Sequence, residues 1–536
     1  MKKFMIVILL SLFLFACQTI TTDSSSTVST TSTTVFSSTS TETTTSSQST
    51  ISSSHSFTTL TTSETVSSTQ STTQIQSCEE KGVEACPFVL AEALPGGSYY
   101  QIATYEYLSE AQKILDGLLS PNLVVKNLSN KVLAMKYGAI NFKTKSISQV
   151  TNLPHTDFHN PTYLNGNYNV DGVYLRSEGI VVYGMIAGVR FEVINTEVEL
   201  IPDVHLHRAY SYYEVVDGEL VHKIAYNLRT ADFQSIGAID IAPDYLSSGV
   251  RYYSYDNHYF YTDFIVMTDD LRNNTYQNAI NHDNPYYNYY QYISFRTKTN
   301  YTALELNSYI SSKTSSSSAL YNSGEDFINA QNSVYINAAM ELAFAIHESG
   351  WGSSRISKDK NNLFGINAVD SDPYNSATSF ESIQACIEYH VQYFLGTRYF
   401  NPTFWVAYGT NFGNKYQGMN YKYASDAYWG EKIAKHYYQL DKALGFKDRN
   451  AYQIALLNPD AIGYYGPNIE SPVVYNPQNY TYRGLWIPFS VMRERDEFYV
   501  LRLPLALNEE YKMDPFLVMG PTDVFYVLKE DVIIVN

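Results

Sequence analysis

The sequence predicts a multidomain protein in which an α-helical domain lies between two β-rich regions, after a Ser/Thr-rich segment. The chain has 536 residues, 44% apolar and 17% charged, so two or three domains with their own cores are expected. Between about residues 301 and 447, apolar residues recur three and four positions apart, which indicates helices. On both sides of this range, short β-branched runs broken by Gly, Asn or Pro are typical of strands.

The charge balance limits the classes of partner. The chain has 36 Lys and Arg against 53 Asp and Glu, a formal net charge of −17. This argues against nucleic acid or anionic lipid as the main partner. The 49 Tyr residues suit two different surfaces, one that binds polyhydroxylated ligands and one that forms solvent-facing β-sheet.

Residues 1–17 have the pattern of a secretory signal. Lys2 and Lys3 precede an apolar run too short to span a membrane, which ends in Leu14-Phe15-Ala16-Cys17. This ending resembles the lipobox of bacterial lipoproteins. The resemblance implies cleavage before Cys17, a lipid on its thiol, and anchorage to the outer face of the cell membrane. An ordinary signal peptide with a chance Cys is the alternative.

Residues 18–77 are predicted to be a disordered linker. Between Thr19 and Ser77, 42 of 59 residues are Ser or Thr. Such a segment cannot bury enough apolar surface to offset its conformational entropy. Cys78 and Cys86 follow, close enough in sequence to form a local disulfide, and Cys386 in an apolar helical stretch is expected to be a buried thiol.

Residues 78–250 form the first β-rich region. Strands are expected at 179–184, 189–194 and 197–202, and one helix at 107–119. The stretch from Ser211 to His222 resembles the SH3-like β modules that accompany bacterial wall hydrolases. Residues 251–300 are dense in Tyr and are expected to pack on the helical domain, on or beside its ligand cleft.

Residues 301–447 are the helical domain. Its predicted helices span 303–310, 324–333, 337–347, 382–395 and 430–444. Residues 448–536 return to short strands, at 498–503, 524–528 and 532–535, and are assigned as a second SH3-like module.

Glu348 is the strongest candidate for chemistry. The apolar helix that begins near Asn337 ends at Gly350 to Gly352, so Glu348 lies in its last turn, beside Trp351. Apolar neighbours and a helix C-terminus both disfavour the ionised carboxylate, so its pKa should rise. A carboxylic acid protonated near neutral pH can protonate a glycosidic leaving oxygen.

Three motifs carry a family resemblance. Residues 348–357, 360–368 and 422–433, read in order, resemble the glucosaminidase domain of bacterial autolysins, glycoside hydrolase family 73. The resemblance implies a lysozyme-like fold for residues 301–447 and an endo-β-N-acetylglucosaminidase. Its substrate would be the peptidoglycan glycan strand, cleaved at the β-1,4 bond after N-acetylglucosamine.

The resemblance also assigns site residues. Glu348 becomes the general acid, and Tyr423 orients the sugar or its acetamide group. Asp370 and Asp372 lie where the family often has a second carboxylate. They also suit loop-forming Asx residues, and an acetamide-assisted route needs no second carboxylate. The predicted substrate-binding residues are Trp351, Asn362, Phe364, Tyr374, Asp426 and Tyr428. Of these, Trp351 and Phe364 also suit the core, and Asp426 suits a cap of the final helix.

Other chemistry is not expected. His347-Glu348 begins like a zincin motif, but Trp351 stands where the second His should be. The pairs His155 with His159 and His205 with His207 are more typical of solvated surface, so neither a metal nor a cofactor is predicted. Two alternatives stay open: a muramidase or lytic transglycosylase on the same fold, and a non-catalytic wall-binding surface lipoprotein.

Overall fold

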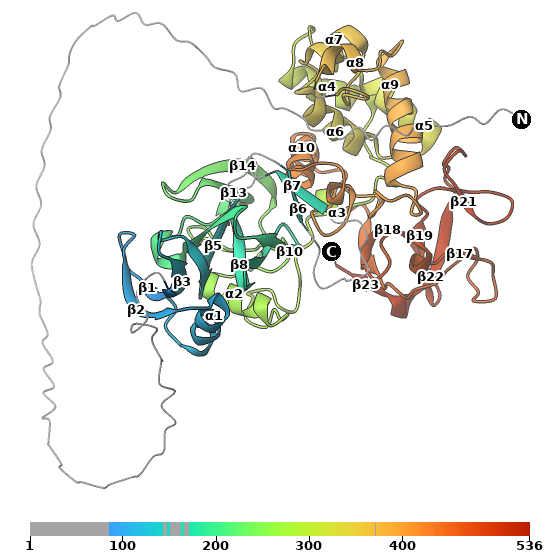
Figure 1. The fold of residues 1–536 in the computed structure, drawn as a ribbon. Helices are drawn as coiled ribbons and strands as arrows, with labels where there is room; N and C mark the ends of the chain where they lie inside the picture. The colour runs from blue at the N-terminus through green and yellow to red at the C-terminus, as the bar shows by residue number, and fades with distance from the viewer. Residues whose placement is uncertain (1–84, 143–146, 151–161, 166–170, 370, 536) are drawn as a thin grey trace, which may run out of the picture. The chain divides into compact units, whose positions relative to one another are not determined.

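The computed structural model describes residues 85–535, apart from 143–146, 151–161, 166–170 and 370 (Figure 1). The predicted signal peptide with Cys17, the linker 18–77, Cys78 and Asp370 lie outside the described residues. Cys86 is disulfide-bonded. Cys386 is a free, fully buried thiol, as predicted, and burial raises its pKa to about 12. None of the described helices is long and apolar enough to cross a membrane.

Two antiparallel sheets open the described chain. The first has the order β2-β1-β3-β4, and helix α1 (Leu108–Gly117) follows its second strand. The second has the order β10-β9-β8-β5-β11. The predicted helix at 107–119 and the strands at 179–184, 189–194 and 197–202 are confirmed within two residues. The strands are β1 (Phe88–Ala93), β2 (Tyr99–Tyr105), β3 (Leu123–Asn127), β4 (Val132–Met135), β5 (Gly138–Phe142), β8 (Asp171–Glu178), β9 (Val181–Ile186), β10 (Val189–Ile194) and β11 (Val198–Pro202).

A three-stranded antiparallel meander completes the first β-rich region. It consists of β12 (Tyr212–Val216), β13 (Glu219–Asn227) and β14 (Asp232–Ile241). The segment from Ser211 to His222 therefore lies in a β-hairpin, and its SH3-like identity stays a prediction. A separate pair joins β6 (Ile147–Val150) to β7 (Thr162–Asn165).

The Tyr-rich segment 251–300 packs on both of its neighbours. It contains α2 (Phe264–Arg272) and α3 (Tyr289–Tyr292). Tyr252 exchanges two backbone hydrogen bonds with Tyr213 and is buried in the β-rich core. Tyr290, by contrast, is fully buried in the core of the helical domain. Most of the Tyr rings in this segment therefore contact protein.

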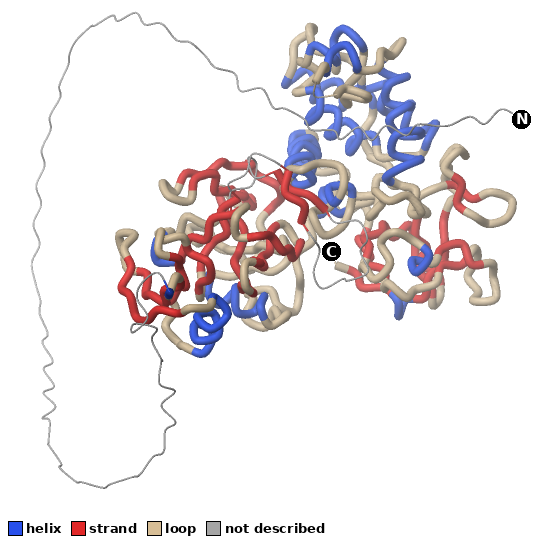
Figure 2. The backbone as a smooth tube through the Cα atoms, viewed as in Figure 1, coloured by secondary structure: helices blue, strands red, loops and turns tan. Residues whose placement is uncertain are grey.

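The middle of the chain is helical, as predicted (Figure 2). A capping box between Thr302 and Glu305 begins its first helix. The helices are α4 (Ala303–Lys313), α5 (Gly324–Val334), α6 (Ala338–Ser349), α7 (Arg355–Lys360), α8 (Pro373–Ser376), α9 (Ile383–Tyr389) and α10 (Trp429–Ala443), and a π-helical segment, η4 (His390–Tyr399), continues α9. The predicted helix at 382–395 is thus an α-helix that widens into a π-helix.

The C-terminal region is a seven-stranded antiparallel sheet with the order β17-β16-β22-β19-β18-β15-β23. The strands predicted at 498–503, 524–528 and 532–535 are confirmed. The strands are β15 (Gln453–Leu457), β16 (Gly463–Tyr464), β17 (Val473–Tyr475), β18 (Ile487–Arg495), β19 (Phe498–Arg502), β22 (Val524–Leu528) and β23 (Val532–Ile534), with a separate pair β20 (Ala506–Leu507) and β21 (Met513–Asp514). The SH3-like identity of this region also stays a prediction.

The helical core extends beyond the predicted boundaries at 301 and 447. Tyr290 and Phe295 precede the first boundary, and Ile454 and Leu505 follow the second, yet all four are buried in the same core as α6 and α10. The described part of the chain is accordingly one compact unit.

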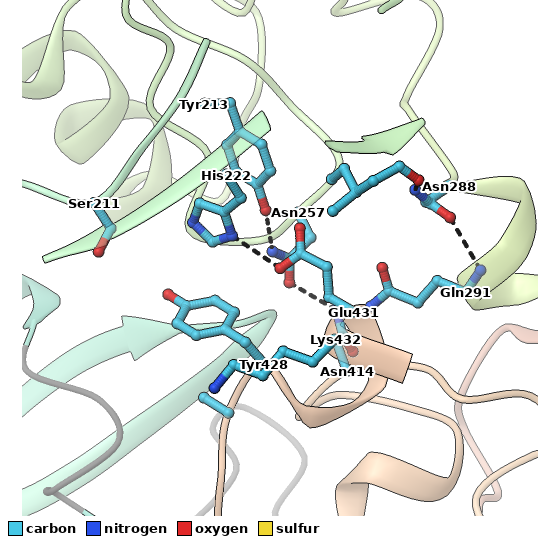
Figure 3. A network of polar contacts seen from close by, with 12 residues as sticks. Ser211, Tyr213, His222, Asn257, Asn288, Gln291, Asn414, Tyr428, Glu431 and Lys432 are labelled. Carbon is cyan, nitrogen blue, oxygen red and sulfur yellow. Dashed lines mark hydrogen bonds and ion pairs between the residues drawn. The ribbon is translucent and has the colours of Figure 1, made fainter. Parts of the chain in front are cut away.

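A buried polar network joins the β-rich region to α10 (Figure 3). His222 Nδ1, on β13, lies 2.8 Å from Glu431 Oε2, and both side chains are almost fully buried. The Tyr213 ring stacks on His222 at 4.0 Å, and the Tyr428 ring meets it edge-on at 4.8 Å. Losing one member of such a buried pair leaves an uncompensated polar group, so the network favours a single docked arrangement.

Candidate active site

The end of α6 fixes the position of Glu348. The Asn337 side chain caps the start of the helix by accepting hydrogen bonds from Ala339 N and Met340 N. At the other end, Gly350, Trp351 and Gly352 all have positive φ, at 56°, 61° and 66°. These three successive residues in the left-handed region reverse the chain after Ser349. Glu348 therefore lies in the last turn of α6, just before the reversal.

Gly352 is required by its surroundings. A Cβ atom there would lie 2.5 Å from Ser318 Oγ and 2.7 Å from the backbone nitrogen of Leu320. Ser318 Oγ donates a hydrogen bond to Trp351 O, at 2.7 Å, and Gly352 O accepts one from Ala319 N, at 2.9 Å. These contacts hold the turn after Glu348 against the loop that follows α4.

The carboxyl group of Glu348 lies in an apolar, aromatic environment. Burial raises its pKa to about 7, and one hydrogen bond acts in the opposite direction, from Trp429 Nε1 to Glu348 Oε1 at 3.0 Å. The rise in the pKa of Glu348 is the change predicted from the sequence. The aromatic residue predicted beside the carboxyl was Trp351, whereas the indole that hydrogen-bonds it belongs to Trp429. Near pH 7 a large fraction of Glu348 is protonated and able to donate.

Trp429 is a candidate site residue that the sequence analysis did not single out. It is the first residue of α10, and its ring stacks on Tyr423 at 4.5 Å and packs edge-on against Phe344 at 5.2 Å. Tyr423 contacts Tyr399 at 5.2 Å. Burial raises the pKa of both tyrosines, and the nearby charge of Glu348 adds to the rise. The signal for Trp429 was available, since it lies inside the third family motif.

Trp351 lies at the edge of the same site. It is partly exposed, and its ring lies 5.9 Å from the rings of both Tyr309 and His436. Burial lowers the pKa of His436 to about 3 and that of His347 to about 4. Both imidazoles are therefore neutral near pH 7 and supply no positive charge that would ionise Glu348.

The structure offers no metal site among the residues it describes. No group of three or more His, Cys, Asp or Glu in that part of the chain could hold an ion. His347, which begins the incomplete zincin pattern in sequence, is half-buried and lies beside His436, at a ring distance of 5.9 Å. The arrangement suits acid–base chemistry by carboxyl and hydroxyl groups.

A buried Glu–His hydrogen bond lies in the core of the helical domain. Glu341 lies two turns before Glu348 on α6, and its Oε1 is 2.6 Å from His390 Nδ1. Both side chains are fully buried, and the His390 ring stacks on Phe364 at 3.7 Å. His390 begins the π-helix that carries Tyr399 at its other end. Sequence reasoning missed this pair because its members are 49 residues apart.

Asp372, a predicted second carboxylate, caps a short helix. It is exposed, and its Oδ1 accepts a hydrogen bond from Asn375 N at 3.3 Å as the N-cap of α8. The loop-forming alternative considered for it therefore describes its local contacts. Asp370 lies outside the described residues, and no carboxylate is among the causes of the raised pKa of Glu348.

Three predicted substrate-binding residues make contacts within the protein. Asn362 is buried, donates to the carbonyls of Ile366 and Thr378 at 3.0 and 2.9 Å, and accepts from Ile366 N. Phe364 is 2% exposed. Tyr374 donates to Asp359 Oδ2 at 3.0 Å, and the Arg355 guanidinium lies 3.8 Å from its ring. Their role in binding substrate stays a prediction.

The remaining two lie at the start of α10. Asp426 accepts a hydrogen bond from Tyr428 N at 2.9 Å and forms an ion pair with Lys432, which stabilises the turn leading into the helix. Tyr428 is 4% exposed and packs in the β-rich core against His222. In this structure Tyr428 serves the junction with the β-rich region, and the neighbouring Trp429 faces Glu348.

Comparisons with known proteins agree with the motifs. Residues 324–442 match the glucosaminidase family model, described as mannosyl-glycoprotein endo-beta-N-acetylglucosaminidase. Two provisionally named endo-beta-N-acetylglucosaminidases of Streptococcus pneumoniae, from serotype 4 strain TIGR4 and strain R6, are each 34% identical to the chain over 235 residues. The aligned part is 41% of this chain and 33% and 31% of those proteins, so the chain spans about a third of their length.

A solved structure also aligns with part of the chain. It is a catalytic mutant of S. aureus autolysin E in complex with the disaccharide NAG-NAM, at 24% identity over 29% of this chain and 73% of that one. Its TM-score is 0.24, which is too low to support a conclusion. The family model and the two S. pneumoniae relatives therefore agree that residues 324–442 are similar to a glucosaminidase domain.

Proposed function

We propose that the protein is a peptidoglycan hydrolase, an endo-β-N-acetylglucosaminidase that cleaves the β-1,4 bond after N-acetylglucosamine with Glu348 as general acid. The observation that carries the proposal is the carboxyl of Glu348, with a pKa near 7 and an indole hydrogen bond at 3.0 Å. An acid with a pKa close to the working pH transfers its proton to a leaving oxygen most effectively.

The proton transfer follows from these contacts. Protonated Glu348 donates to the glycosidic oxygen as the bond to the sugar breaks. The carboxylate left behind keeps its hydrogen bond from Trp429 Nε1, which stabilises the charge in an apolar environment. Tyr423 is only half-buried, and its ring, which stacks on the buried Trp429, is an aromatic surface of the kind on which sugars pack.

The second half of the reaction needs a group that stabilises the developing positive charge on the sugar. The Tyr423 hydroxyl, which lies near Glu348 and Tyr399, suits an acetamide group that attacks from within the substrate. Asp370 and Asp372 stay candidates for a carboxylate in that role. Individual Asp370→Asn and Asp372→Asn variants distinguish the routes, because wall lysis collapses only if the replaced carboxylate takes part.

The decisive experiment digests purified wall with the wild-type and Glu348→Gln chains and identifies the new chain ends by mass spectrometry. We expect reducing-end N-acetylglucosamine from the wild type and almost none from the variant. Anhydro-muramic acid ends would mean a lytic transglycosylase, and reducing-end muramic acid a muramidase. A folded Glu348→Gln chain that keeps most of the activity would contradict the role of Glu348.

We also propose that the chain acts from the outer face of a bacterial membrane, held by a lipid on Cys17 and extended by the linker 18–77. The net charge between Tyr301 and Lys447 is only −2 of the total −17, so the glucosaminidase domain can approach an anionic wall with little repulsion. A Cys17→Ala chain should lose the lipid mass and leave the membrane fraction. Unchanged fractionation would point to an ordinary signal peptide.

A further inference from the structure

A cavity that Glu348 does not line lies at the meeting point of four segments. It has a volume of about 530 Å³, within the range of small-ligand sites. The first β-rich region, the Tyr-rich segment, the 414–417 loop and the C-terminal sheet each contribute to its wall. Its aromatic lining consists of Tyr259, Tyr276, Tyr287, Tyr416 and Trp486.

The cavity wall is tightly built. The turn between β9 and β10 is held on both sides, because Gly188 N donates to Tyr255 O at 2.9 Å and Lys415 N donates to Ala187 O at 3.0 Å. A Cβ atom on Gly188 would lie 2.5 Å from Asn414 Nδ2. Asn414 in turn bonds Asn257 Oδ1 at 3.3 Å (Figure 3). The lining is therefore fixed before any ligand arrives.

Two buried acceptors on this wall have no donor among the described residues. Asp256 is 5% exposed and Gln417 is 2% exposed, and Asp256 Oδ2 and Gln417 Oε1 lack hydrogen-bond partners in that part of the chain. Asp256 Oδ1, in contrast, accepts from Ser254 Oγ, His258 N and Tyr259 N. A buried acceptor without a donor is costly, so a ligand that brought O–H or N–H donors to these atoms would bind more tightly.

His258 and Arg190 complete the polar lining. His258 Nδ1 lies 2.7 Å from Tyr286 O, so it carries the proton, and burial lowers the His258 pKa. The neutral ring then presents Nε2 as a further acceptor. Among the described residues that line the cavity, Arg190 is the only cation and Asp256 the only carboxylate, so their charges offset each other. A near-neutral cavity favours an uncharged ligand.

The cavity has aromatic faces, unpaired acceptors and balanced charges. These features are complementary to a sugar, which has apolar C–H faces and hydroxyl groups that donate hydrogen bonds. We propose that this cavity is a second carbohydrate-binding site, which holds an N-acetylglucosamine-containing segment of glycan apart from the catalytic cleft. The choice of N-acetylglucosamine rests on the proposed function, whereas the carbohydrate class rests on the cavity alone.

The four Trp residues of the chain permit a test that reads the two sites separately. The whole chain with Glu348→Gln is labelled with 5-fluorotryptophan, and each fluorine resonance is assigned by a Trp→Phe replacement. Trp486 reports on the cavity, and Trp351 and Trp429 report on the catalytic site. The probe is tri-N-acetylchitotriose, with cellotriose as the sugar that lacks acetamide groups.

We expect the Trp486 resonance to shift saturably as tri-N-acetylchitotriose is added. The same shift should require a several-fold higher concentration of cellotriose. Asp256→Asn keeps the Oδ1 acceptor but puts an N–H₂ group where the free oxygen lies, so it should weaken the Trp486 response about tenfold. Gln417→Met removes the second acceptor and should also weaken it. Asp263→Asn, at a capping Asp on α2, is the matched control and should leave it unchanged.

Three results would overturn the proposal. The first is a Trp486 resonance that does not move with tri-N-acetylchitotriose. The second is a Trp486 resonance that moves as much in the Asp256→Asn and Gln417→Met chains as in the chain without these replacements. The third is cellotriose binding as tightly as tri-N-acetylchitotriose, which would contradict the choice of N-acetylglucosamine. Failure of the proposed function looks different. In that case the Trp351 and Trp429 resonances stay unmoved and the wild-type chain leaves purified wall intact, whatever Trp486 does.

Discussion

Replacing Glu348 by Gln should stabilise the fold at alkaline pH while it abolishes activity. Burial raises the pKa of Glu348 from its ordinary 4.5 to about 7. Each pH unit between these values costs the native state about 1.4 kcal/mol, so the penalty reaches about 3 kcal/mol above pH 7. Gln cannot ionise, and its side-chain oxygen can still accept the Trp429 hydrogen bond at 3.0 Å.

The sign follows from proton linkage. Below pH 4.5 both states of the wild type carry a protonated Glu348, so the two chains should be equally stable. Between pH 4.5 and about 7 the native state keeps a proton that the unfolded state releases, and wild-type stability falls as pH rises. Above about pH 7 the difference stays constant. The gain from Glu348→Gln should therefore be near zero at pH 4.5 and largest at pH 8.

Urea denaturation of the whole chain, followed by Trp fluorescence at pH 4.5 and pH 8, measures this difference. Glu305→Gln is the control of opposite sign, because hydrogen bonds from Lys447 and Thr302 lower the pKa of Glu305 to about 2. That variant should lose stability at pH 8. If Glu348→Gln and the wild type show the same dependence on pH, Glu348 does not have a raised pKa and the proton-donor argument fails.

Three further predictions concern the support of the site. Trp429→Phe removes a hydrogen bond that favours the carboxylate, so the alkaline limb of the pH–kcat/KM profile should move to higher pH; a downward move would contradict the argument. Glu341→Ala leaves His390 buried and unpaired and should cost about 3–5 kcal/mol in urea denaturation, whereas a cost below about 1 kcal/mol would mean that the pair is not buried. Gly352→Ala should cost at least about 2 kcal/mol, from its positive φ and the close contacts of the added Cβ. Gly179→Ala has a similar φ of 57° with nothing within 4 Å of the Cβ and isolates the smaller backbone contribution; equal losses would rule out the contacts as a cause.

Local signals in the sequence were sufficient for the helices and for Glu348. The 3.6-residue apolar period located α4, α5 and α10, because one face of each helix meets the core. The helix α6 also lies at its predicted position, although its residues 338–346 are all buried. The rise in the pKa of Glu348 could also be predicted, since Glu348 lies in the last turn of an apolar helix and Trp351 follows shortly after it. The partner that bonds its carboxyl could not be identified this way, because Trp429 is 81 residues distant.

The choice between Tyr428 and Trp429 shows why the motif alone was not enough. Both lie in the third motif, and both are aromatic. Tyr428 is the N-cap and Trp429 the first residue of α10, so their side chains leave the backbone in different directions, and only Trp429 hydrogen-bonds Glu348. The residue that faces Glu348 is set by the position of the first turn of α10. That position depends on the buried contacts of Tyr428 and Glu431 with His222 in the β-rich region.

The same contacts change the role expected of the first β-rich region. If the β-rich region were a separable binding module, its removal would leave the position of Glu348 unchanged. Here the first turns of α10 hold Trp429 against Glu348 on one side and Glu431 against His222 on the other. Since His222 and Glu431 are 209 residues apart, residues far upstream help to set the position of the indole that hydrogen-bonds the acid. The helical core also needs Tyr290 and Phe295 from before residue 301. The β-rich region is therefore part of the structure that positions Glu348, and a chain cut at residue 301 would lose both core side chains and the seat of α10.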